Sequence, residues 1–418
     1  MRKFAFTICA KNYIGLARAL ERSAKVTNPE ISFLVFIADE LDHGDFNESL
    51  PNNYHVASQV LDIDVLQWHQ MSFKYDITEF CTSIKPACFR YIFSQYNAGG
   101  CVYLDPDTFL FGSLEGVYSD LLRYSIILTP HINFIEPHYS GALDEKNLLY
   151  SGMYNLGFLA LRNDDISDVL LNWWEVRLMD KCFQSMSENL FTDQKWMDFL
   201  PSFFPSQLFV SPDLGLNLAP WNFHEREVLS IDNTLHIKNR LHSFSRKSYP
   251  LVFVHFSGFN YRDLANGIVS HAALKDLHIS DDLVCLFSRY AFALTQANFS
   301  IYLGLRYSYN FFSDGVRISA FHRRLFRKLL ETDPMLDHPF SKTGTFYALL
   351  NKAGFLSSGI FEAEKLAVSS SNKFLWLFDL SKVFLKTIFF FIGPVRFFML
   401  MRLFRYYSAP ENHLYLLQ

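Results

Sequence analysis

Two carboxylates stand where a buried strand should end. The stretch Cys101–Phe111 reads Cys-Val-Tyr-Leu-Asp-Pro-Asp-Thr-Phe-Leu-Phe, so an apolar strand delivers Asp105 and Asp107 at its carboxyl end. Open α/β sheets bind ligands at that edge. Because Pro106 bends the chain between them, the two side chains can converge on one hard cation. Mg²⁺ or Mn²⁺ held in this way would bridge diphosphate oxygens. For an isolated Asp-x-Asp pair, the alternative is an ordinary solvated turn.

The elements around this pair alternate between apolar strands and helices. This alternation predicts a doubly wound, mostly parallel α/β sheet with helices on both faces. A second Asp-x-Asp pair, Asp62 and Asp64, also follows an apolar run, and we expect no metal there. The expected strands are 4–10, 31–38, 60–65, 101–104, 125–128, 156–162 and 251–256, and the expected helices are 13–24, 86–95 and 168–178.

Composition limits the classes of protein that this chain can be. The chain has 418 residues, of which 50% are hydrophobic, so it is long enough for a large domain with appendages. Its formal net charge of −4 gives no general attraction for nucleic acid. None of the six cysteines forms a CxxC pair, which indicates reduced thiols and a cytosolic compartment. The apolar start is too short for a signal peptide and is interrupted by Lys11.

Several short motifs stand in a fixed order around the Asp pair, and together they resemble glycosyltransferase family 8. This is the retaining GT-A group that includes glycogenin and lipopolysaccharide galactosyltransferases. The resemblance covers roughly residues 4–262. The motifs are Asn12-Tyr13 after the first strand, the stretch Ser83–Arg90, Asn155-Leu-Gly157, Asp193-Gln194 and His255-Phe-Ser-Gly258.

The resemblance implies a GT-A fold and a role for each matching residue. His255 would complete a metal site with Asp105 and Asp107, and Mn²⁺ or Mg²⁺ there would neutralise the leaving diphosphate. Asp193 and Gln194 would lie against the donor sugar as the catalytic residues. The resemblance also implies retention at the anomeric carbon. The donor-binding residues would be Asn12, Tyr13, Lys85, Arg90, Asp105, Asn155 and Gly258.

Two departures from the family pattern affect donor recognition. The loop Ile8–Lys11 lacks the family's base-reading acid, so the UDP-sugar donor is a default choice. Asn260-Tyr-Arg262 replaces the family's Lys-Pro-Trp, and Arg262 would then face the diphosphate in place of the lysine. These departures slightly favour the alternative function, a catalytically idle GT-A domain that serves as a membrane-bound assembly or glycan-binding subunit. The intact Asp105, Asp107 and His255 disfavour it.

Each candidate residue also has a structural interpretation. His255 lies in an apolar strand, where a core histidine is the usual case, and Lys85 and Arg90 could be solvated helix charges. Asn155 could fix a turn, and Asp193-Gln194 could begin a helix. The segment His224-Glu225-Arg226 is predicted to be a polar loop that faces the acceptor, and a salt-bridged surface loop is the alternative.

The pattern changes toward the C-terminus, which divides the chain into three predicted parts. We expect a catalytic domain over 1–275, a helical appendage over 276–368 and a membrane-associated tail over 369–418. The tail mixes Phe and Leu with Lys and Arg, and its longest charge-free stretch, 387–395, is too short for a span. Over 396–405, arginines and apolar residues fall on opposite halves of a helix, which suits the interface of an anionic leaflet.

Together these features predict a hexosyltransferase-type enzyme that moves a sugar from a nucleotide-sugar to a glycan or lipid-linked hydroxyl acceptor. The predicted location is the cytoplasmic face of a membrane, and the predicted process is lipopolysaccharide or other surface glycan synthesis. For the tail, packing against the catalytic domain or a dimer contact is the alternative.

Overall fold

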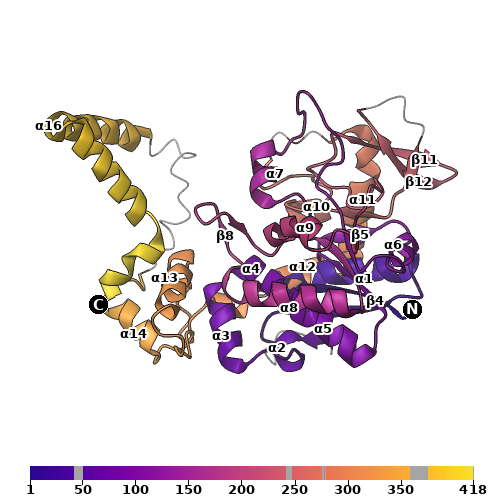
Figure 1. Cartoon of the computed structure of the whole chain (residues 1–418), viewed down its shortest axis with the longest axis horizontal. Helices are drawn as coiled ribbons and strands as arrows, with labels where there is room; N and C mark the ends of the chain where they lie inside the picture. The colour runs from indigo at the N-terminus through magenta and orange to yellow at the C-terminus, as the bar shows by residue number, and fades with distance from the viewer. Residues whose placement is uncertain (42–49, 242–246, 275–276, 278, 358–374, 418) are drawn as a thin grey trace. The chain divides into compact units, whose positions relative to one another are not determined.

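The computed structural model describes residues 1–41, 50–241, 247–274, 277, 279–357 and 375–417. The chain forms two compact units (Figure 1). Unit 1 comprises Met1–Ile63 and Ile77–Tyr307, and unit 2 comprises Asp64–Asp76 and Ser308–Gln418. Unit 2 is therefore built from two separate parts of the chain.

A seven-stranded sheet with the order β10-β6-β7-β4-β1-β2-β3 forms the centre of unit 1. Strand β7 is antiparallel to β4 and β6, whereas the other neighbouring strands are parallel. Strands β2 and β4 flank β1, so the carboxyl ends of β1 and β4 meet where the strand order reverses, the usual ligand position in such sheets. The strands are β1 Lys3–Cys9, β2 Ser32–Ile37, β3 Tyr54–Val56, β4 Gly100–Leu104, β6 Ile126–Leu128, β7 Phe158–Arg162 and β10 Leu208–Val210.

Both faces of this sheet are buried, which explains the continuous apolar runs. On β1, Ala5 and Cys9 belong to the same hydrophobic cluster as Ile14 of helix α1 (Ile14–Thr27). Phe6 lies between these two residues in the sequence but points to the other face of the strand. Its ring lies against that of Phe89 on helix α5 (Lys85–Tyr96), at a centroid distance of 4.8 Å. Because successive residues of a strand point to opposite faces, α1 and α5 cover different faces of the sheet.

In the described part of unit 1, the other strands form three smaller sheets. One joins β5 (Thr108–Leu110) and β14 (Phe253–His255), the second joins β11 (Arg226–Ile231), β12 (Thr234–Asn239) and β13 (Ser248–Pro250), and the third joins β8 (Gln184–Ser185) and β9 (Leu190–Phe191). The remaining helices of unit 1 are η1 Lys11–Tyr13, α2 Ala57–Val60, α4 Ile77–Ser83, α6 Glu115–Asp120, α7 Glu145–Ser151, α8 Asp165–Asp180, η2 Gln194–Phe199, α9 Leu200–Phe203, α10 Tyr261–Ala265, α11 Asp281–Gln296 and α12 Phe299–Leu303.

Unit 2 is helical in its described residues. Its core contains Phe73, Phe326, Phe346 and Leu417, all of them buried. Its helices are α3 Val65–Lys74, η3 Ser308–Asn310, α13 Ala320–Leu330, α14 Thr345–Lys352, α16 Leu375–Tyr407 and η5 Pro410–Leu417.

Helix α16 is broken within its length. Gly393 has a φ of 75° and a ψ of 167°, and Pro394 follows it, so two helical parts meet at a kink. Among the described residues, one helical segment, Leu380–Tyr407, is long and apolar enough to cross a membrane by length and composition alone. Its mean hydropathy is 1.8.

The predicted α/β class with a mostly parallel sheet and a helical C-terminal segment is confirmed. The strand predicted over 60–65 is wrong, because the Asp64 carboxylate accepts hydrogen bonds from the backbone of Leu66 and Gln67 and so begins α3. Helices α11 and α12 belong to unit 1. The roles predicted for 1–275, 276–368 and 369–418 stay predictions, and the boundary at 368–369 lies outside the described residues.

Candidate active site

Asp105 and Asp107 lie at the carboxyl edge of the central sheet. The backbone amide of Thr108 donates to the carbonyl of Asp105 at 3.0 Å, so a tight turn reverses the chain from β4 into β5. The amide of Asp105 donates to the carbonyl of Gly157 at 2.9 Å, which ties this turn to the start of β7. Neither aspartate is fully buried, with side-chain exposures of 26% and 15%, so both carboxylates can reach a ligand.

The pairing of β5 with β14 brings His255 to the same place. His255 is paired with Thr108, next to Asp107. Its Nε2 lies 3.0 Å from Oδ1 of Asp107 and 3.6 Å from Oδ2 of Asp105. The three side chains, called here the Asp–His centre, offer ligand atoms that all lie within 4.8 Å of one another. Two carboxylates and one imidazole are a donor set that fits Mn²⁺ or Mg²⁺.

A hydrogen-bonded chain fixes the orientation of the His255 ring. Nδ1 of His255 lies 3.1 Å from Oδ1 of Asn155, which also accepts from the amide of Gly157 at 3.2 Å. Because an amide oxygen only accepts, Nδ1 of His255 carries a proton, and Nε2 is the ring atom that faces the two aspartates. Such a partner on the second ring nitrogen is the usual support of a metal-ligating histidine.

The charges within the Asp–His centre act strongly on one another. Burial lowers the pKa of His255, but Asp107 and Asp105 raise it, and the net pKa is raised. Burial raises the pKa of Asp107, but His255 and a hydrogen bond from Tyr261 lower it, and the net pKa is lowered. Two carboxylates around one imidazole leave an excess of negative charge that a divalent cation would neutralise.

Lys85 connects the Asp–His centre to Asp193. Its Nζ lies 2.7 Å from Oδ2 of Asp193 and 3.9 Å from Oδ1 of Asp105, and it donates to the carbonyl of Leu156 at 2.8 Å. It also lies 4.1 Å from the centroid of the Tyr103 ring, whose hydroxyl donates to Asp105. Burial raises the pKa of Asp193, Lys85 lowers it and Asp105 raises it again, so that the net pKa is raised.

Gln194, predicted to face the donor sugar with Asp193, is engaged with the protein itself. Its Oε1 accepts from the backbone amide of Leu156 at 3.0 Å and from Nδ2 of Asn155 at 3.3 Å. Its Nε2 donates to the carbonyl of Ser151 at 2.9 Å. Gln194 therefore holds Asn155, which in turn contacts His255, and the catalytic role predicted for Gln194 stays a prediction.

A cavity of about 480 Å³ lies next to the Asp–His centre. Three predicted site residues line it, namely Asn155, Gln194 and Gly258. Trp221 also lines the cavity, and its ring meets the His255 ring edge-on at a centroid distance of 5.3 Å. Aromatic and polar groups around a cavity of this size suit a small-molecule ligand.

The first loop of the sheet also reaches this region. The Tyr13 and Tyr261 rings meet edge-on at 5.9 Å, and the Tyr261 hydroxyl donates to Oδ2 of Asp107 at 2.6 Å. Oδ1 of Asn12 is buried and has no hydrogen-bond partner in the structure, so a ligand could satisfy it. Tyr261 was absent from the predicted site. The sequence placed it beside Arg262, which is exposed on α10, but gave no sign of its contact with Asp107.

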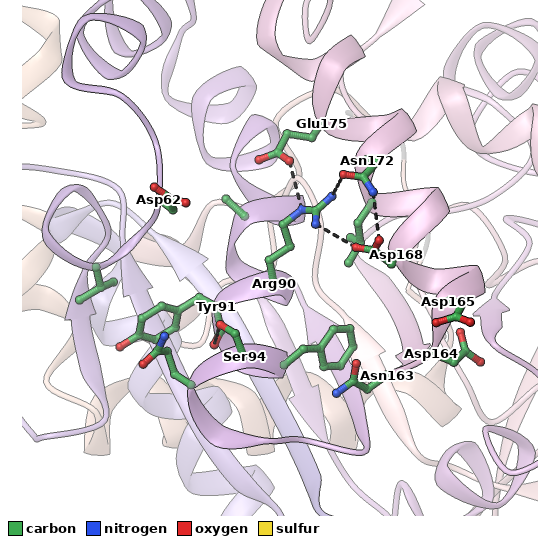
Figure 2. Close-up of a pocket in the computed structure, with 15 residues that line it drawn as sticks. Asp62, Arg90, Tyr91, Ser94, Asn163, Asp164, Asp165, Asp168, Asn172 and Glu175 are labelled. Atoms are coloured by element: carbon green, nitrogen blue, oxygen red, sulfur yellow. Dashed lines mark hydrogen bonds and ion pairs between the residues drawn. The ribbon is translucent and has the colours of Figure 1, made fainter.

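Arg90 lies in a different cleft, which Figure 2 shows. Its guanidinium donates to Asp168 at 2.9 Å, to Glu175 at 3.1 Å and to Asn172, all on α8. Asp62, the first residue of the other Asp-x-Asp pair, also lines this cleft. These contacts tie α5 to α8, and the described contacts of Arg90 include none with the Asp–His centre.

The prediction of a polar loop at His224-Glu225-Arg226 is wrong. Glu225 and Arg226 are buried, and the carboxylate of Glu225 accepts from the backbone amides of Asn133 and Phe134. The Arg226 guanidinium donates to carbonyls of the segment 214–216. The buried ion pair of these two residues holds neighbouring loops together, since each partner also satisfies backbone groups.

Comparison with known proteins finds distant relatives. No protein-family model matches the chain. The uncharacterized protein YfnF of Bacillus subtilis (strain 168) is 23% identical over 274 residues, which cover 65% of this chain and 84% of that protein.

Among solved structures, the galactosyltransferase LgtC in complex with donor and acceptor sugar analogues has a TM-score of 0.39 and 14% identity, covering 70% of this chain and 95% of that one. Mouse xyloside xylosyltransferase 1 has a TM-score of 0.38 and 11% identity, covering 61% of this chain and 97% of that one.

Proposed function

We propose that this chain is a metal-dependent glycosyltransferase of the GT-A type. It would move a sugar from a nucleoside diphosphate sugar to a hydroxyl acceptor. The observation that carries the proposal is the Asp–His centre, in which Asp105, Asp107 and His255 converge at the switch point of the sheet. The adjoining cavity of about 480 Å³ gives a sugar a place beside that centre.

The residues of the site divide the proposed reaction between them. Asp105, Asp107 and His255 would hold Mn²⁺ or Mg²⁺, which supplies charge neutralisation of the leaving diphosphate. Asn155 and Gln194 keep the His255 imidazole in the tautomer that a cation requires. The Lys85 ammonium lies close enough to Asp105 to add a donor to the same oxygens.

The donor sugar would occupy the cavity beside the Asp–His centre, and the nucleotide would lie on the other side. There we propose that Asn12 and Tyr13 contact the base and ribose, with UDP as the default nucleotide. Gly258 and Arg262 are proposed for the diphosphate. Asp193 is proposed to stabilise positive charge that develops on the sugar, with retention at the anomeric carbon. For Arg90 we propose a structural role instead, because its guanidinium is bound to α8.

We propose that the enzyme works on the cytoplasmic face of a membrane, on a glycan or lipid-linked acceptor of a lipopolysaccharide or other surface glycan. The support is helix α16, whose apolar side chains are exposed and whose basic residues suit an anionic surface.

A binding measurement tests the metal and donor proposals together. Calorimetric titration of UDP should show affinity that requires Mn²⁺ or Mg²⁺ and that is lost in Asp107→Asn. The control is Asp62→Asn, which alters an aspartate of the Arg90 cleft and should bind as the wild type does. Binding that is independent of the metal and of Asp107 would refute the proposed site.

A screen of nucleotide sugars for thermal stabilisation, followed by donor hydrolysis with Mn²⁺, identifies the donor. Metal-dependent binding without turnover for every donor and acceptor tried would support the alternative, an idle glycan-binding subunit.

A further inference from the structure

A second cluster of metal-ligating side chains lies entirely within unit 2. It consists of His69 on α3 and of Asp337 and His338, which follow α13 in the chain, and their ligand atoms all lie within 4.8 Å of one another. None of these residues belongs to the Asp–His centre or to its supports. We propose that they form a second metal site that binds Zn²⁺ and joins the two parts of the chain that make up unit 2.

The elements that carry the three residues are held in place by other contacts. The side-chain amide of Gln70, next to His69, donates to the carbonyls of Pro334 and Leu336 at 2.8 and 3.1 Å. Leu336 is buried in the core of unit 2, beside the turn that carries Asp337. Nε1 of Trp68 donates to the Tyr309 hydroxyl at 2.8 Å. The backbone segments that carry the three residues are therefore held next to one another by contacts outside the cluster.

Asp337 lies between the two imidazoles. Its Oδ1 is 3.2 Å from Nδ1 of His69, and its Oδ2 is 3.5 Å from Nε2 of His338. Ligand atoms about 2.0–2.1 Å from a tetrahedral Zn²⁺ are separated by about 3.3 Å, so these distances are close to those of a zinc site. The His338 side chain is 72% exposed and has the freedom to close the remaining distance.

The backbone of His338 supports a role in presenting a ligand. Its φ is 51°, in the left-handed region that residues with a Cβ rarely occupy. The amide of His338 donates to Oδ1 of Asp337 at 2.6 Å, and the carbonyl of His338 accepts from the amide of Ser341 at 3.0 Å, which closes the turn that follows. This conformation keeps the exposed His338 ring near His69, with ring centroids 6.1 Å apart.

The ligand chemistry distinguishes this cluster from the Asp–His centre. Two imidazoles and one carboxylate favour a borderline ion such as Zn²⁺, whereas two carboxylates and one imidazole favour a harder ion such as Mn²⁺. Three protein ligands leave a fourth position for water. Because His69 and Asp337 are 268 positions apart in sequence, a bound ion would link α3 to the later part of unit 2 and stabilise the folded state.

Zinc competition with a chromophoric chelator tests the proposal, and Asp107→Asn in the full chain serves as the background because it disables the Asp–His centre. We expect one zinc ion per chain in this background, and weakening by more than about 10-fold when His338→Asn is added. Asparagine tolerates the left-handed backbone, so this variant removes the imidazole without disturbing the turn. His69→Ala should have the same effect. Exposed His138→Asn is the control and should leave zinc binding unchanged.

Amide hydrogen exchange gives a second readout that does not depend on activity. Zn²⁺ should slow exchange in α3 and in the segment 334–341 of the Asp107→Asn protein, and His338→Asn should abolish this protection. If the Asp107→Asn protein retains no zinc against the chelator, or retains it equally well with His338→Asn, the proposed site is refuted. Because neither readout involves a nucleotide sugar, failure here leaves the proposed transferase function unaffected.

Discussion

At the residue scale, Gly157 sets the position of the His255 ring. A Cβ at residue 157 would lie 2.3 Å from Cε1 and 2.6 Å from Nδ1 of His255. The ring is buried, so Gly157→Ala should displace it and weaken Mn²⁺ binding by about 10-fold or more, as losses of supporting contacts do. Gly116→Ala is the matched control, since a Cβ there meets nothing within 4 Å. Calorimetric titration measures the Mn²⁺ affinity of both variants. Equal affinities would contradict the prediction that His255 is a metal ligand.

The buried pair of Lys85 and Asp193 has its own test. Lys85→Met leaves the Asp193 carboxylate buried without its cation, and the free energy of unfolding should fall by about 3–5 kcal/mol. Adding Asp193→Asn should recover much of this loss, because a neutral amide costs less to bury. Urea unfolding of the two single variants and the double variant measures the coupling. Additive losses would show that the pair does not act as one unit.

His131 should make the stability of unit 1 sensitive to acid. Burial lowers the pKa of His131 to about 4, from an ordinary value of 6.5. Its stabilising contribution is therefore complete above about pH 6.5 and is lost as the pH falls toward about 4, a total of roughly 3 kcal/mol. In His131→Phe, which keeps an aromatic ring against Trp221, this part of the pH dependence should disappear. Urea unfolding at about pH 7 and about pH 4.5 compares the two proteins. An unchanged difference between the two pH values would contradict the assignment.

The sequence indicated which residues end strands more reliably than which way helical side chains point. Asp105 directly follows β4 and His255 lies on β14, and the apolar runs predicted both strands. The pairing of β14 with β5, which brings the two side chains together, was not predicted. Lys85 and Arg90 were grouped as donor contacts, but five residues on a helix rotate by about 140°, so they face different neighbours. Only Lys85 reaches Asp105. The Tyr261–Asp107 contact joins residues 154 positions apart, and no local pattern records it.

At the element scale, the mispredicted strand at 60–65 and the missed β11–β12 hairpin have local causes. The apolar run at 60–65 suggested a strand, but the capping carboxylate of Asp64 marks a helix start that periodicity alone did not separate from a strand. The β11–β12 hairpin was not predicted. Its turn residues Asp232 and Asn233 both have positive φ, 48° and 64°, and this Asp-Asn pair was the available signal.

Helix α3 depends on one buried arginine of α13. The Arg323 guanidinium donates to the carbonyls of Phe73 and Tyr75, each at 2.6 Å, at the end of α3, and to Tyr309 at 2.7 Å. Arg323→Met should lower the free energy of unfolding by about 3 kcal/mol or more, because several buried carbonyls lose their donor together. Thermal unfolding and hydrogen exchange of α3 measure the effect. Lys328→Ala, which removes an exposed charge of the same helix, should change the free energy of unfolding little. Equal losses of stability in the two variants would refute the role of Arg323 in holding α3.

At the scale of the whole molecule, we propose that α16 is the element through which the protein binds a membrane. The sequence predicted separate basic and apolar faces over 396–405. In the structure, Ile388–Ile392 are five consecutive apolar residues, and Phe389, Phe390 and Phe391 among them are exposed, so apolar side chains surround this one turn of the helix before the kink at Gly393. Helical residues that are apolar on every side favour immersion in lipid over contact along one face.

Truncation after residue 371 is a poor test of this role, because it also removes η5, whose Leu417 is buried in the core of unit 2. A cleaner variant replaces Phe389, Phe390 and Phe391 by serine and leaves η5 intact. Each exposed phenylalanine that enters lipid contributes about 1.5–3 kcal/mol, so the triple variant should lose nearly all sedimentation with anionic liposomes. It should still bind UDP with Mn²⁺. The control replaces Leu122, Phe292 and Ile301, three exposed apolar residues of unit 1, by serine, and should sediment as the wild type does. If the wild-type protein ignores the liposomes at low salt, or the phenylalanine variant still binds them, α16 is a packing element and the membrane proposal fails.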